Sequence, residues 1–344
     1  MTFKYKNVYI NDTATITGSY EQNGPLGNYF DKSYHDLYFG KKTWEQAESK
    51  LVEDSVDLLL SKLNKTRFDI DLMISGDLLN QIVASNYAAS NLGIPYLGIY
   101  SACATSVEGL IIGSNMVEKN QINNCICSVS SHNNAAEKQF RYPTEYGGVK
   151  PKTTTFTTTG GASAYLSSNP NGIKIESGTI GTVIDMDIKD AYNMGAVMAP
   201  ACADTIYKHL RDMKRDINYY DLILSGDLGI YGKKILKEYM KVEYGMDLKK
   251  YDDTACMIYD IESQPVYAGG SGPACAPLVT YSYIFDKMKK KELKRVLLVA
   301  TGALMSTTMV NEKLSIPAIA HAISLEVSEW IILMHFYLQD LFVY

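Results

Sequence analysis

The chain has 344 residues, of which 46% are hydrophobic and 21% charged. This length and composition predict a soluble globular protein with a large core, built as two domains or as one large duplicated domain. A formal net charge of −5 gives no basic footprint, so we expect no nucleic-acid partner. The N-terminus lacks the apolar core of a signal peptide. The most apolar stretch, Trp330–Tyr344, is shorter than the ~20 residues of a membrane-spanning helix.

Cysteines and nucleotide motifs exclude further classes. The six cysteines are scattered, without a CxxC pair or a cysteine–histidine cluster, which predicts a reducing compartment and no metal site. The sequence contains no GxxxxGKS/T loop, GxSxG elbow or complete dinucleotide loop. We therefore expect no cofactor.

The first half of the chain alternates helical and strand patterns. Apolar residues at helical spacing predict a helix over Trp44–Lys65, begun by the capping pair Thr43 and Gln46, and a second helix over Ile82–Leu92. Continuous apolar runs at Tyr96–Tyr100 and Cys125–Ser130 are typical of strands buried on both faces. Buried strands that alternate with helices predict a mostly parallel sheet covered by helices.

An internal repeat extends this pattern to the second half. The segment DLMISGDL at Asp71–Leu78 recurs as DLILSGDL at Asp221–Leu228, an offset of 221 − 71 = 150 residues. Helical patterns flank the second copy as well, over Ala199–Arg215 and Gly232–Tyr244, and Val296–Ala300 is a further buried strand. We predict a duplicated α/β protein with halves at 1–170 and 171–326, joined near the turn at 169–172, and an atypical hydrophobic tail at 327–344.

Cys103 lies at a predicted strand-to-helix turn. The run that ends at Tyr100 passes through Ser101 and Ala102 to Cys103, and a helical pattern begins at once. Free backbone N–H groups at a helix start lower the pKa of a nearby thiol, so this setting favours a reactive cysteine.

Several long motifs carry a family resemblance. Two similar halves with a cysteine late in the first resemble the thiolase fold of condensing enzymes, a duplicated α-β-α-β-α layered architecture. More specifically, the chain resembles the stage V sporulation protein AD family in five segments: 130–148, 194–201, 267–278, 300–306 and 315–326. The resemblance implies a non-catalytic protein that binds dipicolinic acid, alone or with calcium, and helps its uptake into the forming endospore.

The same resemblance implies partners and a location. Integral-membrane stage V sporulation proteins of the same operon type are the implied partners. The implied location is peripheral, at the forespore or spore inner membrane, after synthesis in the cytoplasm. Thiolase-like proteins often pair through the first-half sheet, which makes a homodimer our expectation. The resemblance ends near Glu326, before the tail.

Groups that condensing enzymes use are missing from the second half. Where thiolases carry Gly-His-Pro, this chain has Cys275-Ala276-Pro277, and where they carry a late cysteine it has Ala300-Thr301-Gly302-Ala303. Where type III ketoacyl synthases place a histidine, it has Ser225-Gly226-Asp227. A condensing or acyl-transfer enzyme that uses Cys103 with His132 remains the alternative, and so does a scaffold with a vestigial pocket. Cys275 is a substitute for the missing base or, as we favour, a small buried hydrophobe.

The remaining candidates are ligand-binding residues. Among the five histidines, we expect His132 in the pocket because it follows a buried strand, with a structural role as its alternative. His209 is expected at the surface and His321 in a buried structural role. A flat dicarboxylate needs N–H or O–H donors and a planar cation. Beside Cys103 and His132, the candidates for these are Ser101, Ser131, Arg141 and Lys138, and a solvated loop is the alternative for the last two.

Overall fold

The two sequence copies occupy matching places in one sheet. The computed structural model describes residues 1–140 and 149–328. The helices are α1 (Ser19–Gln22), α2 (Trp44–Leu63), α3 (Val83–Leu92), α4 (Thr105–Glu118), α5 (Asn133–Phe140), α6 (Met194–Met213), α7 (Gly229–Tyr244), α8 (Thr254–Met257), α9 (Cys275–Val279), α10 (Phe285–Lys289) and α11 (Thr307–Asn311). The strands are β1 (Thr2–Lys4), β2 (Tyr9–Thr17), β3 (Lys32–Ser33), β4 (Leu72–Gly76), β5 (Tyr96–Gly98), β6 (Asn124–Ser131), β7 (Phe156–Thr157), β8 (Gly160–Ser167), β9 (Ile173–Ile180), β10 (Leu222–Ser225), β11 (Tyr251–Asp253), β12 (Gly270–Ser271), β13 (Arg295–Ala303) and β14 (Ala318–Val327).

Strand order repeats between the halves. The main sheet runs β11-β10-β13-β14-β9-β2-β8-β6-β4-β5. From one edge inward the order is β11, β10, β13, β14 and β9, and from the other edge it is β5, β4, β6, β8 and β2. Numbered along the chain within each set of five, both orders are third, second, fourth, fifth and first. The repeated segments form β4 and β10, which hold the same place in this order. Residues 169–172 form the turn between β8 and β9, and the halves meet where Tyr9 and Ile10 pair with Lys174 and Ile173.

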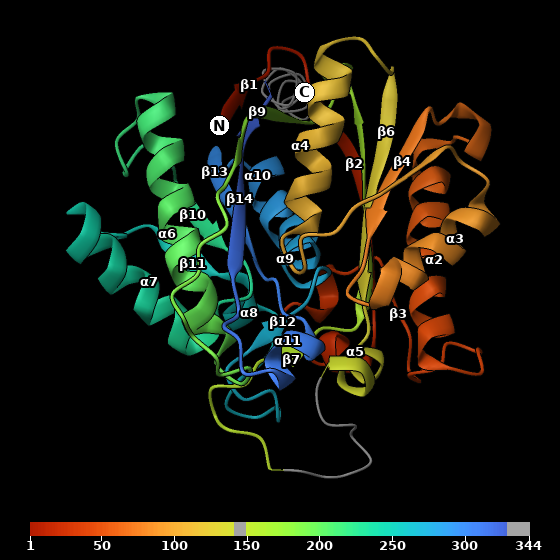
Figure 1. Ribbon diagram of the computed structural model, residues 1–344. Coiled ribbons are helices and arrows are strands. Elements are labelled where there is room, and N and C mark those ends of the chain that lie inside the picture. Colours follow the sequence, from red (N-terminus) through yellow and green to blue (C-terminus); the bar gives the residue numbers. More distant parts are fainter. Residues whose placement is uncertain (141–148, 329–344) are drawn as a thin grey trace, which may run out of the picture.

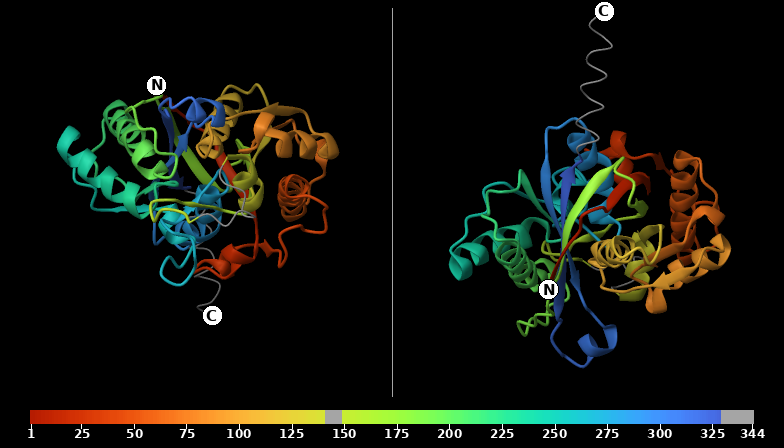
Figure 2. Two further views of the ribbon diagram at one scale, coloured as in Figure 1. Left: turned by 60° about the horizontal axis from the view of Figure 1, so that its bottom comes forward. Right: turned by 90° about the horizontal axis from the view of Figure 1, so that it is seen from above.

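Helices separate and cover the sheet halves in five layers. In Figure 1, α2 and α3 cover one outer face and α6 and α7 cover the other, while α4, α9 and α10 lie between the two halves of the sheet. The views of Figure 2 show the same order from below and from above. This α-β-α-β-α arrangement is the duplicated, layered fold that the sequence predicted.

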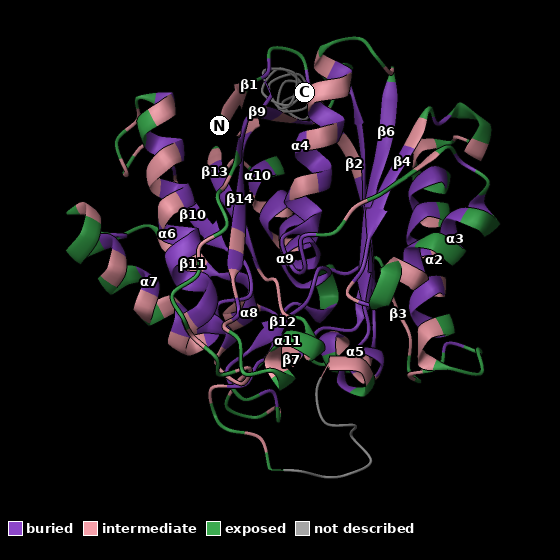
Figure 3. Cartoon of the chain, in the orientation of Figure 1, coloured by how far each residue is buried: buried purple, intermediate pink, exposed green. Residues whose placement is uncertain are grey.

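Burial follows the layers. Figure 3 shows the central strands as mostly buried and α4 as buried or intermediate, whereas the outer helices expose their outward faces. All eight residues of β6 are buried, as its continuous apolar sequence predicted. The prediction for Tyr96–Tyr100 is wrong in part, because β5 ends at Gly98 and forms an edge of the sheet. Leu97 is 41% exposed and Tyr100 is 43% exposed.

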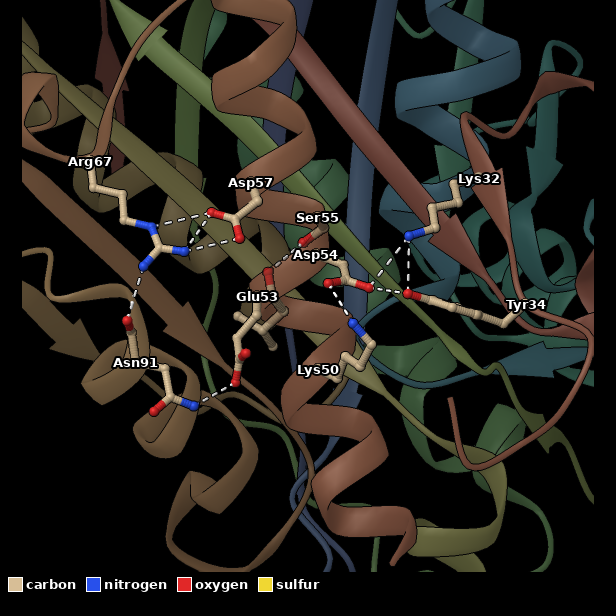
Figure 4. A network of polar contacts seen from close by, with 10 residues as sticks. Lys32, Tyr34, Lys50, Glu53, Asp54, Ser55, Asp57, Arg67 and Asn91 are labelled. Carbon is tan, nitrogen blue, oxygen red and sulfur yellow. Dashed lines mark hydrogen bonds and ion pairs between the residues drawn. The ribbon is translucent and has the colours of Figure 1, made fainter. Parts of the chain in front are cut away.

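The helix α2 shows how local sequence sets its limits. The hydroxyl of Thr43 accepts a hydrogen bond from the Gln46 backbone N–H at 3.3 Å, which is the predicted cap. Ion pairs fix the outward face of α2, as Figure 4 shows: Lys50 pairs with Asp54, and Arg67 pairs with Asp57. The first pair lies within α2, and the second ties the helix to the segment that follows it.

The expected tail falls almost entirely outside the described residues. Val327 pairs with Ile173 and ends β14, and residues 329–344 are not described. Within 1–140 and 149–328, no helix is both long enough and apolar enough to cross a membrane.

Candidate functional site

A tight backbone elbow presents Cys103 at the start of α4. Ala102 has a left-handed φ of 49°, which an alanine adopts only at a cost of order 1–3 kcal/mol. The backbone N–H of Ala104 donates to the Ser101 carbonyl at 3.0 Å, and the Thr105 hydroxyl donates to the Ala102 carbonyl at 2.6 Å. These bonds hold the elbow. They leave the Cys103 side chain at the wall of a pocket, with 9% of the residue exposed.

Asp227, from the second copy of the repeat, lies beside that cysteine. Its backbone is left-handed, with a φ of 68°, and its Oδ2 accepts a hydrogen bond from the Gly272 N–H at 2.9 Å. The carboxylate of Asp253 holds this turn by accepting the backbone N–H groups of Leu228 at 3.2 Å and Gly229 at 3.0 Å. The Asp227 carboxyl lies close enough to the Cys103 thiol to raise its pKa, while the Asp227 Oδ1 is buried without a hydrogen-bond partner.

Electrostatics at this pair oppose thiolate formation. Burial raises the pKa of the Cys103 thiol well above its usual value, and the neighbouring Asp227 carboxyl raises it further. Burial also raises the pKa of Asp227 well above its usual range, and Asp253 adds to that shift. The helix start was expected to activate the thiol. Instead, desolvation outweighs it, so the thiol stays protonated near neutral pH.

Cys275 is a second buried thiol whose pKa Asp227 affects. Its thiol is fully buried and lies 3.9 Å from the Thr254 hydroxyl. Burial raises the pKa of Cys275 well above its usual value, with Asp227 as the next cause. A protonated thiol cannot act as the base that a condensing reaction requires.

The pocket beside Cys103 is small and mostly apolar. Its volume is about 60 Å³. Residues from both halves line it: Leu78, Tyr100, Ala102, Cys103, Ala136, Phe140, Thr157, Met194, Met198, Ser271, Ala303 and Met305. Among these lining residues are thiol and hydroxyl groups but neither a histidine nor a cation. The Ser271 hydroxyl lies 4.0 Å from the Cys103 sulfur.

The two predicted serines lie near the pocket without lining it. The Ser131 hydroxyl donates to the Thr158 carbonyl at 2.6 Å and packs against Gly272, where a Cβ would lie 2.7 Å from the Ser131 Oγ. Gly272 also has a φ of 101°, so glycine is required there. The Ser101 hydroxyl lies 3.5 Å from the Nε2 of His321, on the far side of the elbow.

The structure places His132 and Lys138 away from the pocket. The His132 ring is buried against Phe39, and its Nε2 lies 2.8 Å from the Leu37 carbonyl. Burial lowers the pKa of His132 to about 4, which keeps the ring neutral. Lys138 points outward and pairs with Glu45 at 2.6 Å, because α5 turns that position to solvent. Neither His132 nor Lys138 therefore lines the pocket, although both were expected there. Arg141, the third such candidate, lies outside the described residues.

The expectation for His209 is wrong. His209 is fully buried, 2.8 Å from the Thr179 hydroxyl and 2.7 Å from the Tyr220 hydroxyl. Its charged neighbours Lys208 and Arg211 lie on other faces of α6, since successive helix positions turn by 100°. Burial lowers the pKa of His209 to about 3. The expectation for His321 agrees with its position: it is buried in β14, and the Gly181 N–H donates to its Nδ1 at 3.3 Å.

Sequence reasoning missed Asp227 and Ser271 as neighbours of the cysteine. A signal for Asp227 was available, because it ends the repeated SGD segment, and its counterpart Asp77 is also fully buried. Ser271 gave no such signal. For metals, no group of three histidine, cysteine or acidic side chains in the described parts of the chain is arranged to hold an ion.

Known proteins resemble this chain over nearly its full length. OleA from Xanthomonas campestris matches with a TM-score of 0.60 and 14% identity, covering 94% of this chain and 99% of that one. The 3-oxoacyl-acyl-carrier-protein synthase III from Aquifex aeolicus VF5 matches with a TM-score of 0.57 and 11% identity, covering 93% and 99%. These two likenesses establish the thiolase-like fold.

Closer relatives identify the family. The model of the family described as stage V sporulation protein AD matches residues 1–326. Stage V sporulation protein AD of Bacillus subtilis (strain 168) is 46% identical over 319 residues, which cover 93% of this chain and 94% of that protein. With this fold, this site and these matches, the chain belongs to the stage V sporulation protein AD family.

Proposed function

We propose that this protein binds dipicolinic acid in the pocket beside Cys103 and helps its uptake into the forming endospore, without catalysing a reaction. The observation that carries the proposal is a thiolase-type cysteine pocket in which the described lining residues include no base. Family membership supports the sporulation role. A fold that hosts condensing enzymes thus retains a binding pocket.

The protonation of the Cys103 thiol and of the nearby carboxyl supports a protein without catalytic activity. Condensation needs a thiolate and a base that receives the thiol proton. The buried carboxyl of Asp227 is the nearest candidate base, and burial raises its pKa well above its usual range, which disfavours the carboxylate that a base requires. His132, His209 and His321 hold other hydrogen bonds away from the pocket. Nothing in the lining therefore generates the nucleophile.

The chemistry of the pocket lining suits a flat ring with a polar edge. Tyr100, Met198 and Leu78 provide apolar surface, and the hydroxyl groups of Ser271 and Thr157 provide hydrogen bonds. A dianion also requires a cation. Arg141 directly follows the lining residue Phe140 in sequence, and we assign it that role because guanidinium binds carboxylates by paired hydrogen bonds.

Calorimetric titration of dipicolinate, with and without calcium, tests this function. Isophthalate, the same dicarboxylate without the ring nitrogen, is the matched control ligand. We expect saturable binding of dipicolinate and weaker binding of isophthalate. A protein that binds neither ligand between roughly micromolar and millimolar concentration would remove the basis of the proposal.

A second candidate is acyl transfer with Cys103 as nucleophile. Its support is the fold shared with a 3-oxoacyl-acyl-carrier-protein synthase III and the position of Cys103 at the pocket wall. Turnover of an acyl thioester that disappears in Cys103→Ala would establish this activity. Inertness toward a panel of thioesters would rule it out in favour of binding.

The partners are part of the same proposal. We assign integral-membrane stage V sporulation proteins as partners at the forespore membrane, and a homodimer formed through the edge strand β5. The exposed side chains of Leu97 and Tyr100 beside that edge support the dimer. Light scattering should give a dimer mass for the wild type and a monomer mass for Leu97→Asp.

A scaffold role is the third possibility. Pocket variants that leave sporulation intact would favour it over ligand binding.

A further inference from the structure

A second, larger pocket adjoins the cysteine pocket. Its volume is about 430 Å³. It is lined by Gln139, Phe140, Ala191, Tyr192, Met305, Thr307, Val310 and Asn311. Phe140 and Met305 line both this outer pocket and the inner one. Both side chains are half-buried and come from opposite halves of the chain, Phe140 from the end of α5 and Met305 from the loop before α11. In Figure 1, α5 and α11 lie at the same end of the molecule.

The inner pocket alone is too small for the proposed ligand. One water requires roughly 10–15 Å³ of such volume, so the pocket's 60 Å³ corresponds to about four to six waters. A cavity of about 150 Å³ holds benzene, and dipicolinate adds two carboxylates to a ring of that size, so 60 Å³ cannot enclose it. Protein interiors are close-packed, so the missing space must come from side chains that move. Phe140 and Met305 are the two that separate this pocket from the 430 Å³ beyond.

The outer pocket offers an unsatisfied donor. The Nε2 of Gln139 is buried and has no hydrogen-bond partner. A buried amide without a partner is unfavourable, and a ligand acceptor at that point would relieve this cost. Thr307 and Asn311 add a hydroxyl and an amide on the facing wall. Neutral donors of this kind suit the carboxylate end of a ligand whose ring lies deeper.

We propose that the ligand occupies both pockets at once, after Phe140 and Met305 move apart, and that Gln139 donates to its outer carboxylate. This proposal rests on the proposed function for the identity of the ligand but not for the passage itself. Methionine is unbranched and flexible, and the Phe140 ring is free of the constraints of a fully buried one, so both can change rotamer. The two residues then set the rate of entry to Cys103.

Alkylation of Cys103 by reagents of two sizes tests the passage. Iodoacetamide is the small reagent and N-phenylmaleimide the large one, with Cys103 followed by peptide mass spectrometry. Ionisation of the thiol affects both rates alike, so their ratio isolates access. We expect Phe140→Ala and Met305→Ala each to raise the ratio of large to small by at least tenfold. Met309→Ala is the matched control, since Met309 is 46% exposed in α11 and lines neither pocket.

A variant that fills the outer pocket, instead of enlarging it, gives a test that does not depend on creating a cavity. Ala191→Trp fills the outer pocket and should lower the ratio several-fold while iodoacetamide still reacts. Ratios that stay at the wild-type value in all three pocket variants would overturn the passage.

Protection by ligand separates the passage from the function. Dipicolinate should slow alkylation of Cys103 in the wild type, and Gln139→Leu should require at least tenfold more ligand for the same protection. Altered ratios without protection would leave the passage standing and refute the ligand. If the ligand protects the wild type and Gln139→Leu needs no more ligand for the same protection, the assignment of that donor is refuted.

Discussion

The buried carboxyl of Glu21 allows a quantitative test of how strongly burial raises a carboxyl pKa in this protein. Glu21 is fully buried, and its Oε1 accepts hydrogen bonds from the Tyr259 hydroxyl and from the Thr159 N–H at 2.9 Å. Burial raises its pKa from 4.5 to about 7, although these donors favour the charged form. The same cause raises the pKa of Asp227. The titration of Glu21 therefore tests whether burial raises carboxyl pKa values in this protein, on which the proposed lack of catalysis depends.

We expect Glu21→Gln to abolish a pH-dependent loss of stability. Because the folded pKa lies above the unfolded one, the stabilising contribution is complete below pH 4.5 and is lost as pH rises through 7. A shift of about 2.5 units at 1.36 kcal/mol per unit gives about 3 kcal/mol, most of it lost by pH 7. Glutamine preserves the shape and the acceptor oxygen but does not titrate. Relative to Glu21→Gln, the wild type should lose about 3 kcal/mol between pH 4 and pH 8.

Urea unfolding of both proteins at half-unit pH steps measures this difference. Tyr259→Phe is the informative partner variant, because it removes a donor that favours ionised Glu21. Its loss of stability toward pH 8 should exceed that of the wild type. A wild-type minus Glu21→Gln difference that is flat across this range would refute the reasoning, since it would mean that burial does not keep the carboxyl neutral.

Other predictions follow from the site and its frame. Gly272→Ala should abolish ligand binding and destabilise the protein, because its Cβ would lie 2.7 Å from the Ser131 hydroxyl at a φ of 101°; retained binding in calorimetry would contradict this. Thr43→Ala should cost about 1 kcal/mol in urea unfolding by removing the α2 cap, and no change would show that the cap contributes nothing. The alkylation rate of Cys103 should keep rising beyond pH 9, because burial and Asp227 raise the thiol pKa, and a plateau near pH 7 would reveal an activated thiolate.

Much of the fold was accessible from the sequence because it depends on local patterns. The repeated segments, the capped helix α2 and the buried strand β6 each have a signature in residue spacing. What could not be predicted depends on the position of an element within the whole. The apolar run at Tyr96–Tyr100 gives no sign that β5 is an edge strand, because an edge is defined by the absence of a neighbour.

The candidate site was predicted in part for the same reason. Cys103 is identified by its own turn, whereas its neighbours come from distant segments. His132 follows a buried strand as expected, yet its ring turns to the Leu37 carbonyl instead of the pocket. Lys138 is drawn to Glu45 on the surface. Asp227 belongs to the second copy of the repeat, and only the fold brings it near Cys103 in the first half.

Titration of dipicolinate into wild type, Cys103→Ala and His132→Ala tests the central claim most directly. The wild type should bind, and Cys103→Ala should bind more weakly because Cys103 lines the pocket. His132→Ala, checked for folding, should bind within a few-fold of the wild type, since its ring lies against Phe39 away from the pocket. Absence of binding to the folded wild type, or equal affinity in Cys103→Ala, would contradict a ligand site at this cysteine.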